Sequence, residues 1–180
     1  PLLPVNARCT EVSGNCRKPI INQEFGISTI GLSNSKDKIA QTFVLPKSAK
    51  ELTEIAPFVM DYFGYMGCMS IYEQTMATQP QSGKLLAEYQ VDIAKLKKDE
   101  YNSLFIDPIT LDPKKSYSIV FSLLDNESFI SFAKGNELSS YYDGNAYYLK
   151  RPLNECSGND CPIVEWIDRQ DDIKFKLKFY

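Results

Sequence analysis

The sequence predicts an all-β fold in which antiparallel strands form a sandwich or a barrel. Short runs of β-forming residues recur between Gly67 and Phe121, and Gly or Pro residues separate them, a spacing typical of such folds. The last run, Ile173–Phe179, alternates apolar and lysine side chains without a fault, as a half-buried strand does. Eleven Tyr and ten Phe residues also suit the pleated surface of a sheet.

The N-terminal part is expected to form an arm, and the rest a single sandwich domain. We place the arm and a first strand in residues 1–38, and the sandwich in residues 39–180. Residues 1 to about 26 lack a strong hydrophobic period, so we expect them to pack on the body as an arm. A short strand is predicted at Ile27–Gly31.

The body of the domain opens with two strand candidates. Ile39–Leu45 is a β-type run that Pro46 ends, because proline has no N–H to donate to a sheet ladder. Leu52–Phe63 is apolar but contains Pro57. For the same reason we expect this second run to be an edge strand or a bulged strand.

Turn residues divide the remainder of the chain into further strands. Gln79–Gly83, Leu111–Lys115 and Asp143–Asn145 carry the residues of turns, and Ile93–Lys98 is expected to form one helical turn. The three lysines on one face of the last strand indicate a solvated or edge position. The predicted strands are Gly67–Glu73, Lys84–Val91, Leu104–Ile106, Ser116–Phe121, Phe129–Ala133, Ala146–Leu149, Ile163–Ile167 and Ile173–Phe179.

Composition excludes several classes of function. The net charge is −3, with no long run of one sign, so the basic footprint of a nucleic-acid binder is missing. No apolar run approaches the roughly 18 residues of a membrane span. The chain contains no histidine, which excludes His-dependent triads, Cys–His dyads and zinc hydrolases built from this chain alone. Composition does not exclude a hydrolase whose catalytic groups are all carboxylates.

Four of the five cysteines form two pairs that are close in sequence. Cys9 and Cys16 enclose one Ser-Gly-Asn turn, and Cys156 and Cys161 enclose another, so two local disulfides are predicted. Cys68 lies in an apolar run and is expected to be free and buried. Two disulfides imply an oxidising compartment. The alternatives are a zinc cluster, whose usual CxxC spacing is missing, and five unpaired thiols.

The order of elements resembles the jelly-roll β-sandwich modules of exported bacterial proteins, a loose group of carbohydrate-binding-like and surface-anchor-associated domains. The similarity covers about residues 39–180 and implies a jelly-roll topology, export, and recognition at a surface. It brings no set of catalytic residues with it. The matching segments are Ala40–Phe43, Met69–Tyr72, Pro80–Ala87, Phe105–Leu111, Tyr117–Val120, Tyr141–Tyr148, Trp166 and Ile173–Tyr180.

A tyrosine-rich segment is the predicted ligand site. Sugar-binding modules stack aromatic faces on pyranose rings and bind hydroxyl groups through nearby amides and carboxylates. Because neighbours on a strand point to opposite faces, one member of each tyrosine pair is expected in the core, together with Trp166. The alternative is that all of these aromatic residues are core. The predicted ligand-binding residues, with the Cys156–Cys161 loop beside them, are Tyr141, Tyr142, Asp143, Asn145, Tyr147 and Tyr148.

Two other kinds of site have weaker support in the sequence. Asp125–Glu127, or Asp168 with Asp171 and Asp172, would supply oxygen ligands for calcium, but Asp-rich loops are usually ordinary turns. A glycosidase needs two carboxylates at a set separation, and nothing singles out such a pair among 23 acidic residues. We therefore predict no enzyme, no cofactor and no metal site.

The sequence thus predicts a secreted or cell-surface bacterial module that recognises a surface ligand, with a glycan as the expected class. The alternative is a structural or adhesive module, such as the tip of a surface fibre, in which a homotrimer buries the tyrosines between its subunits. The expected partners are a glycan or cell-surface ligand and further copies of the chain, without nucleic acid and without a membrane span.

Overall fold

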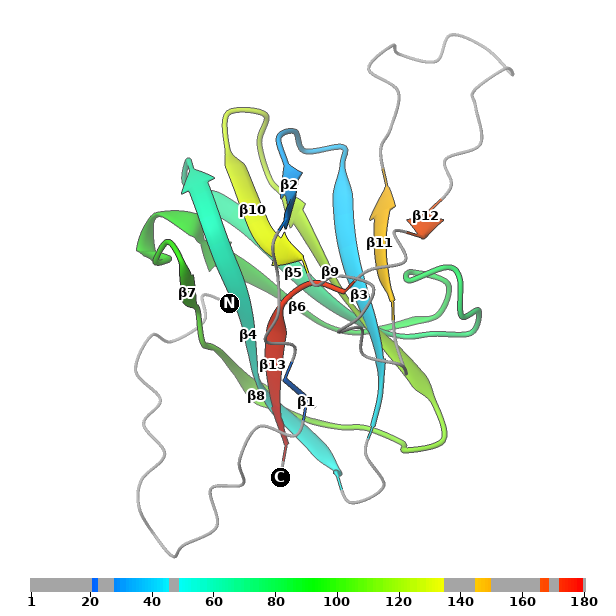
Figure 1. The fold of residues 1–180 in the computed structure, drawn as a ribbon. Helices are drawn as coiled ribbons and strands as arrows, with labels where there is room; N and C mark the ends of the chain where they lie inside the picture. Colours follow the sequence, from blue (N-terminus) through cyan, green and yellow to red (C-terminus); the bar gives the residue numbers. More distant parts are fainter. Residues whose placement is uncertain are drawn as a thin grey trace, which may run out of the picture.

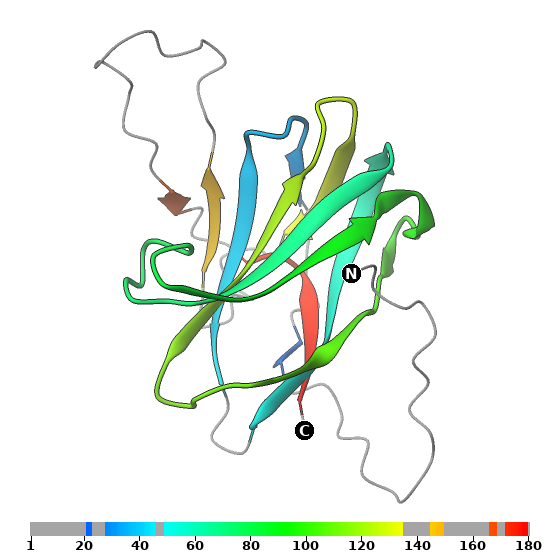
Figure 2. The same ribbon diagram turned by 180° about the vertical axis from the view of Figure 1, so that it is seen from behind.

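Two antiparallel β-sheets face each other and form a sandwich, which confirms the predicted all-β class (Figures 1 and 2). The structure is a computed structural model, and it describes residues 21–22, 28–45, 49–134, 145–149, 166–168 and 172–179. The predicted N-terminal arm therefore lies outside the described residues. The described part holds no helix with the length and apolarity of a membrane span.

One sheet is built around β3, and we call it the β3 sheet. Neighbouring strands follow the order β12-β11-β3-β9-β5-β6. A single 3-10 turn, η1 (Ile93–Lys95), follows β6 where the sequence predicts a helical turn. The strands are β12 (Ile167–Asp168), β11 (Ala146–Leu149), β3 (Lys38–Val44), β9 (Ser116–Leu123), β5 (Met66–Glu73) and β6 (Lys84–Asp92).

The other sheet is built around β4, and we call it the β4 sheet. Its order is β1-β13-β4-β10-β2, and β7 and β8 also pair with β4. The strands are β1 (Ile21–Asn22), β13 (Phe175–Phe179), β4 (Glu51–Phe63), β10 (Phe129–Lys134), β2 (Ser28–Leu32), β7 (Glu100–Tyr101) and β8 (Leu104–Thr110).

The strand order is that of a jelly roll. One layer contains β2, β10, β4 and β8 side by side, and the other contains β3, β9, β5 and β6. The chain crosses between layers from β2 to β3, from β3 to β4, from β4 to β5, from β6 to β7, from β8 to β9 and from β9 to β10. Two sheets wound in this interleaved way define the double-sheet jelly roll.

β4 is the central strand of its sheet, so the prediction of an edge strand was wrong. It pairs with β13 and β10 along one side and with β8 and β7 along the other. The Pro57 carbonyl accepts from the Asn102 N–H, 3.0 Å away, on the β7–β8 side. Because the N–H and C=O of one residue face the same neighbouring strand, the N–H that Pro57 lacks would also face that side. That side of Pro57 lies between the pairing of β8, which reaches Ile55, and that of β7, which begins at Phe58. The expected bulges do occur, as register shifts in three of these pairings.

The core lies between the sheets and is dominated by aromatic and branched side chains. Phe121 of the β3 sheet packs against Phe132 of the β4 sheet, with ring centroids 4.8 Å apart. The predicted alternation of the last strand is confirmed, because Phe175, Leu177 and Phe179 are buried. β13 lies between β1 and β4, so it is not an edge strand, and its lysines are half-buried. Cys68 is free and buried, as predicted.

A buried polar contact ties the two sheets together. Gln41 of β3 donates from Nε2 to Asp172 Oδ1 at 2.7 Å, and its Oε1 accepts from the Ile173 N–H at 2.8 Å. Both Gln41 and Asp172 are 1% exposed. Residues 172–174 lead into β13 of the other sheet, so this contact fixes where the C-terminal strand enters the β4 sheet.

We expect Gln41→Leu to lower the free energy of unfolding by about 2–4 kcal/mol, because it leaves a buried carboxylate oxygen and a buried N–H without this partner. Urea denaturation followed by circular dichroism measures the change. Gln79→Leu is the matched control, since Gln79 is exposed in a turn, and should stay within about 0.5 kcal/mol. Equal unfolding midpoints for the two variants would show that the Gln41 contact does not stabilise the sandwich.

Candidate functional site

The structure describes three of the six predicted ligand residues. Asn145, Tyr147 and Tyr148 are described. The remaining three and the four predicted disulfide cysteines lie outside the described residues and stay predictions: Tyr141, Tyr142, Asp143, Cys9, Cys16, Cys156 and Cys161.

Tyr147 is built into the fold on the outer face of the β3 sheet. It is 4% exposed and packs with Ala40 and Val120, and the half-buried Tyr72 and Trp166 pack against this cluster. Its hydroxyl donates to the Ala77 carbonyl at 3.3 Å. Burial raises the pKa of the Tyr147 phenol. The ring therefore has little surface to offer a ligand, and Trp166 lies outside the space between the sheets.

Tyr148 points to the opposite face, as strand alternation predicts. Its ring is half-buried against the main core, and its hydroxyl donates to Asp37 Oδ2 at 2.9 Å. Asn145 is exposed, and its side chain donates to Asp168 Oδ2 at 3.1 Å. The polar groups of Asn145, Tyr147 and Tyr148 thus form hydrogen bonds within the protein.

The carboxylates that were predicted as calcium ligands also form hydrogen bonds within the protein. Asp125 accepts from the backbone of Glu127 and Ser128 within one turn, and Asp172 accepts from Gln41. Asp171 lies outside the described residues. Among the residues that the structure describes, no group of three or more metal-ligating side chains comes together.

Three of the six large apolar side chains that are exposed among the described residues lie at one end of the sandwich, which we call the loop end. It comprises the β4–β5 turn (residues 63–65), the β9–β10 loop (residues 124–128) and the β2–β3 loop (residues 33–37), all at the top of both ribbon views (Figures 1 and 2). Phe63 is 69% exposed, Tyr65 72% and Leu124 49%. Exposed apolar side chains that lie close together are candidates for a contact surface, and these three lie at adjacent turns.

A rigid frame presents these side chains. Asp125 Oδ1 accepts from the Ser128 N–H at 2.6 Å, and Ser128 Oγ donates to Asp125 Oδ2 at 3.0 Å. Ser128 Oγ in turn accepts from the Tyr65 N–H at 3.2 Å. The bond from the Ser128 hydroxyl holds the pKa of Asp125 below its usual value. Gly64, between the two aromatic residues, has φ +104° and lies against Ser128.

Further backbone contacts tie the loop end to its neighbours. The Tyr65 carbonyl accepts from the Ile93 N–H at 2.8 Å, and the Leu124 N–H donates to the Met66 carbonyl at 3.3 Å. The β2–β3 loop joins through Ser35, whose N–H and hydroxyl both donate to Asn126 Oδ1, at 2.9 and 2.7 Å. Hydroxyl, amide and carboxylate groups thus join the three loops of the loop end to one another.

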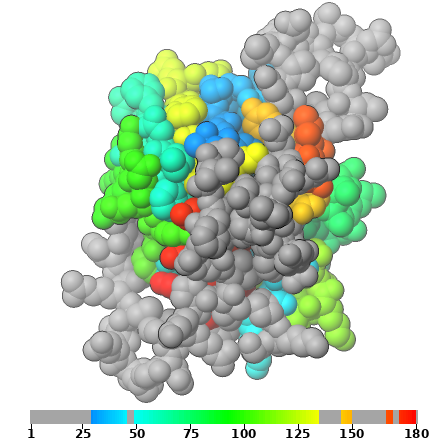
Figure 3. Space-filling view, in the orientation of Figure 1, coloured from blue at the N-terminus to red at the C-terminus, as the bar shows by residue number. Residues whose placement is uncertain are grey.

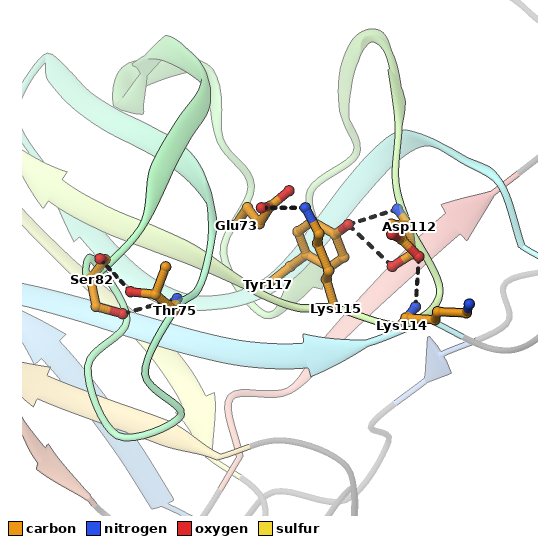
Figure 4. A network of polar contacts seen from close by, with 7 residues as sticks. All are labelled: Glu73, Thr75, Ser82, Asp112, Lys114, Lys115 and Tyr117. Carbon is orange, nitrogen blue, oxygen red and sulfur yellow. Dashed lines mark hydrogen bonds and ion pairs between the residues drawn. The ribbon is translucent and has the colours of Figure 1, made fainter.

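The opposite end of the sandwich is built from polar groups that satisfy one another (Figure 4). Tyr117 accepts from the Asp112 N–H at 2.7 Å, and burial raises the pKa of its phenol. Lys115 pairs with Glu73 at 2.6 Å, which raises the pKa of the lysine. These contacts hold the β8–β9 loop against β5. Among the described residues, the exposed aromatic rings therefore lie at the loop end, whereas these contacts at the opposite end are polar.

One feature of the sequence points to the loop end. Phe63, Gly64 and Tyr65 place two aromatic residues around a glycine between two strands. Such a turn exposes its flanking side chains because the chain reverses there. The predicted site rested on the number of tyrosines between residues 141 and 148. Whether a tyrosine is exposed depends instead on how the rest of the chain packs against it.

The comparisons with known proteins identify a fold and no family. No protein-family model matches the chain, and no curated protein matches it. The structure is similar to that of the clostridial cysteine protease Cwp84 after propeptide cleavage, with a TM-score of 0.55 at 14% sequence identity. The similarity covers 86% of this chain and 38% of that chain. At this identity the likeness shows the fold alone, and this chain spans well under half of the protein it matches.

This finding corrects the prediction that the chain is not an enzyme. The matched fold occurs within the chain of a cysteine protease, so an all-β sandwich without a recognisable catalytic motif does not exclude an enzymatic protein. The physical reason is that a sandwich can form one part of an enzyme whose reacting groups lie elsewhere in the chain. The absence of histidine limits only what these residues can do by themselves.

We expect Tyr147→Ala to lower the free energy of unfolding by about 3–5 kcal/mol, the usual cost of removing a buried aromatic side chain. Tyr65→Ala, which truncates a tyrosine that is 72% exposed, is the matched control and should stay within about 0.5 kcal/mol. Guanidinium denaturation of both variants measures the difference. If Tyr147→Ala were as stable as the control, the buried cluster would not exist and the predicted tyrosine site would be restored.

Gly64→Ala is expected to lower the free energy of unfolding by at least about 2 kcal/mol, because a side chain at φ +104° is strained and its Cβ would lie 2.6 Å from Ser128 Cα. Thermal denaturation measures the loss. Gly67→Ala is the control, since its Cβ would meet the Ser122 carbonyl at 3.3 Å and no positive φ is involved. Equal loss in both variants would contradict a strained turn at Gly64.

Proposed function

We propose that this sandwich is the surface-recognition domain of an exported bacterial protein and that it binds a glycan at the loop end. The observation that carries the proposal is the exposure of Phe63 and Tyr65 on a hydrogen-bonded frame. Aromatic faces stack on the apolar faces of sugar rings. A frame that is already ordered lowers the entropy lost on binding.

The polar surroundings of the two rings support the same ligand class. Ser35 and Asn126 bring a hydroxyl and an amide to the loop end, and Glu127 is exposed there. Asp125, with its lowered pKa, is ionised near neutral pH and accepts hydrogen bonds. Sugars offer many hydroxyl donors and acceptors, so they suit a site in which a few polar groups surround an apolar platform.

Export rests on two expectations from the sequence, namely the two local disulfides and the resemblance to exported jelly-roll modules. The structural similarity adds that this fold occurs as one part of a larger chain, since it occupies 38% of the chain of Cwp84. In our proposal the sandwich likewise works as the recognition part of a larger protein. Whether that protein carries a catalytic activity is a separate question from what the loop end binds.

We expect Phe63→Ala and Tyr65→Ala each to weaken glycan binding about fivefold or more, because a stacked aromatic ring contributes on the order of 1 kcal/mol and 1.4 kcal/mol corresponds to a factor of ten. A glycan array with the unaltered protein identifies the neutral glycans bound, and titration calorimetry then measures each variant. Both variants should unfold at the same denaturant concentration as the parent, since both rings are exposed.

Met76→Ala is the matched control, because Met76 is 56% exposed and lies in the β5–β6 loop, at the opposite end of β5. It should leave the affinity unchanged. No binding to any glycan, or equal losses in all three variants, would sink the proposal. If Phe63→Ala and Tyr65→Ala instead turned a trimer into a monomer in sedimentation velocity, the loop end would be an assembly surface and the adhesive alternative would replace the glycan.

A further inference from the structure

A second surface with a different character lies on the outer face of the β4 sheet. Lys174, Lys176 and Lys178 alternate with the buried residues Ile173, Phe175, Leu177 and Phe179 of the C-terminal strand, so all three lysines share that outer face. Atoms of β13, in red, reach the molecular surface on this side (Figure 3). Lys178 has a carboxylate partner, because Nζ lies 2.6 Å from Oε2 of the buried Glu54.

The other two lysines are held by aromatic rings. Lys174 Nζ lies 4.2 Å from the centroid of the Phe58 ring and 5.5 Å from that of Tyr101. Lys176 Nζ lies 3.9 Å from the centroid of the same Tyr101 ring. The two rings meet edge to face, with centroids 5.1 Å apart and an interplanar angle of 88°. Cation–π attraction thus fixes both ammonium groups above one aromatic pair.

Register explains how these groups meet. Phe58 pairs with Tyr101 across β4 and β7, and its N–H donates to the Lys174 carbonyl at 2.8 Å. Lys176 lies opposite Ala56, whose small side chain leaves room above β4 for the lysine to reach the Tyr101 ring. The arrangement therefore follows from the pairing of three segments and does not depend on a mobile loop.

The described residues give Lys174 and Lys176 no carboxylate partner, in contrast to Lys178. Two positive charges held on one aromatic pair repel each other, and an anion placed between them would remove that repulsion. Both side chains are half-buried, so an anion there would be less screened by salt than one on an open surface.

We propose that Lys174 and Lys176 form a binding site for an anionic polysaccharide, one that carries carboxylate or sulfate groups along its chain. Lys174 and Lys176 are successive outward-facing residues of the same segment, which suits charges that recur along a polymer. A footprint of two cations disfavours nucleic acid, which binds through many phosphate contacts. The site is separate from the loop end and does not require the proposed function to hold.

The test compares the parent chain with the double variant Lys174→Gln/Lys176→Gln. The probes are polygalacturonate, which carries carboxylates, and dextran sulfate, with neutral dextran and a DNA duplex as comparisons. Biolayer interferometry at low salt is expected to show binding to at least one acidic polysaccharide and none to neutral dextran. The double variant should lose about tenfold or more in affinity, since exposed charge pairs contribute up to about 1 kcal/mol each.

Two control variants distinguish a specific site at Lys174 and Lys176 from a non-specific effect of net charge. Lys95→Gln/Lys97→Gln makes the same change in net charge at two lysines that are 62% and 73% exposed, and it should leave the affinity unchanged. Lys174→Arg/Lys176→Arg keeps both charges and the cation–π contacts, so it should retain binding. Denaturation midpoints of all variants show whether a loss of binding is a loss of folding.

The inference is overturned if neither acidic polysaccharide binds, if both Gln double variants lose affinity equally, or if the Arg variant binds no better than the Gln variant. Tighter binding of DNA than of either polysaccharide would also overturn it, in favour of a nucleic-acid site. Phe63→Ala and Tyr65→Ala are expected to leave acidic-polymer binding unchanged, so failure at the loop end and failure at the lysine pair can be told apart.

Discussion

The architecture depends on hydrogen bonding along both edges of β4. This strand is long enough to pair with β13 and β10 on one side and with β8 and β7 on the other, so four segments of the β4 sheet are held by one strand. Pro57 is compatible with this role because its missing N–H falls on the side where two partner strands leave a gap. A proline at Ile55 or Val59 would face a paired neighbour and remove a ladder bond. The position of one proline thus decides whether the second layer of the sandwich is continuous.

The loop end and the surface around Lys174 and Lys176 both lie next to β4. At its C-terminal end β4 turns at Gly64 into β5 of the other sheet, and the turn exposes Phe63 and Tyr65 while Ser128 holds the backbone. In its middle, the outer face places Phe58 beside Tyr101 and under the C-terminal lysines. Both surfaces use aromatic side chains, but their chemistry differs. The rings of the loop end are open to solvent, whereas those of the lysine pair are already engaged by cations, which leaves the charges and not the ring faces for a ligand.

Burial also explains why Tyr147 and Tyr148 do not form an open platform. A tyrosine ring on a sheet face serves a ligand only if no other part of the chain covers it. The β5–β6 loop reaches across the outer face of the β3 sheet, where the Ala77 carbonyl accepts from Tyr147 and the Pro80 carbonyl accepts from Ser118. Tyr148 faces the core side and binds Asp37. The same hydroxyl groups that would have contacted a sugar therefore hold the β11 strand in place.

Features that depend on neighbours along the chain could be predicted from the sequence. Period-two alternation predicted the buried face of Ile173–Phe179 and the opposite faces of Tyr147 and Tyr148, and the apolar surroundings of Cys68 predicted its burial. These inferences hold because side-chain direction on a strand is set locally. Only the tertiary structure decided that β4 is central, that Tyr147 is covered while Tyr65 is not, and that Lys174 and Lys176 meet one aromatic ring. Each of these depends on which segments, distant in sequence, come to lie side by side, and no local pattern contains that information.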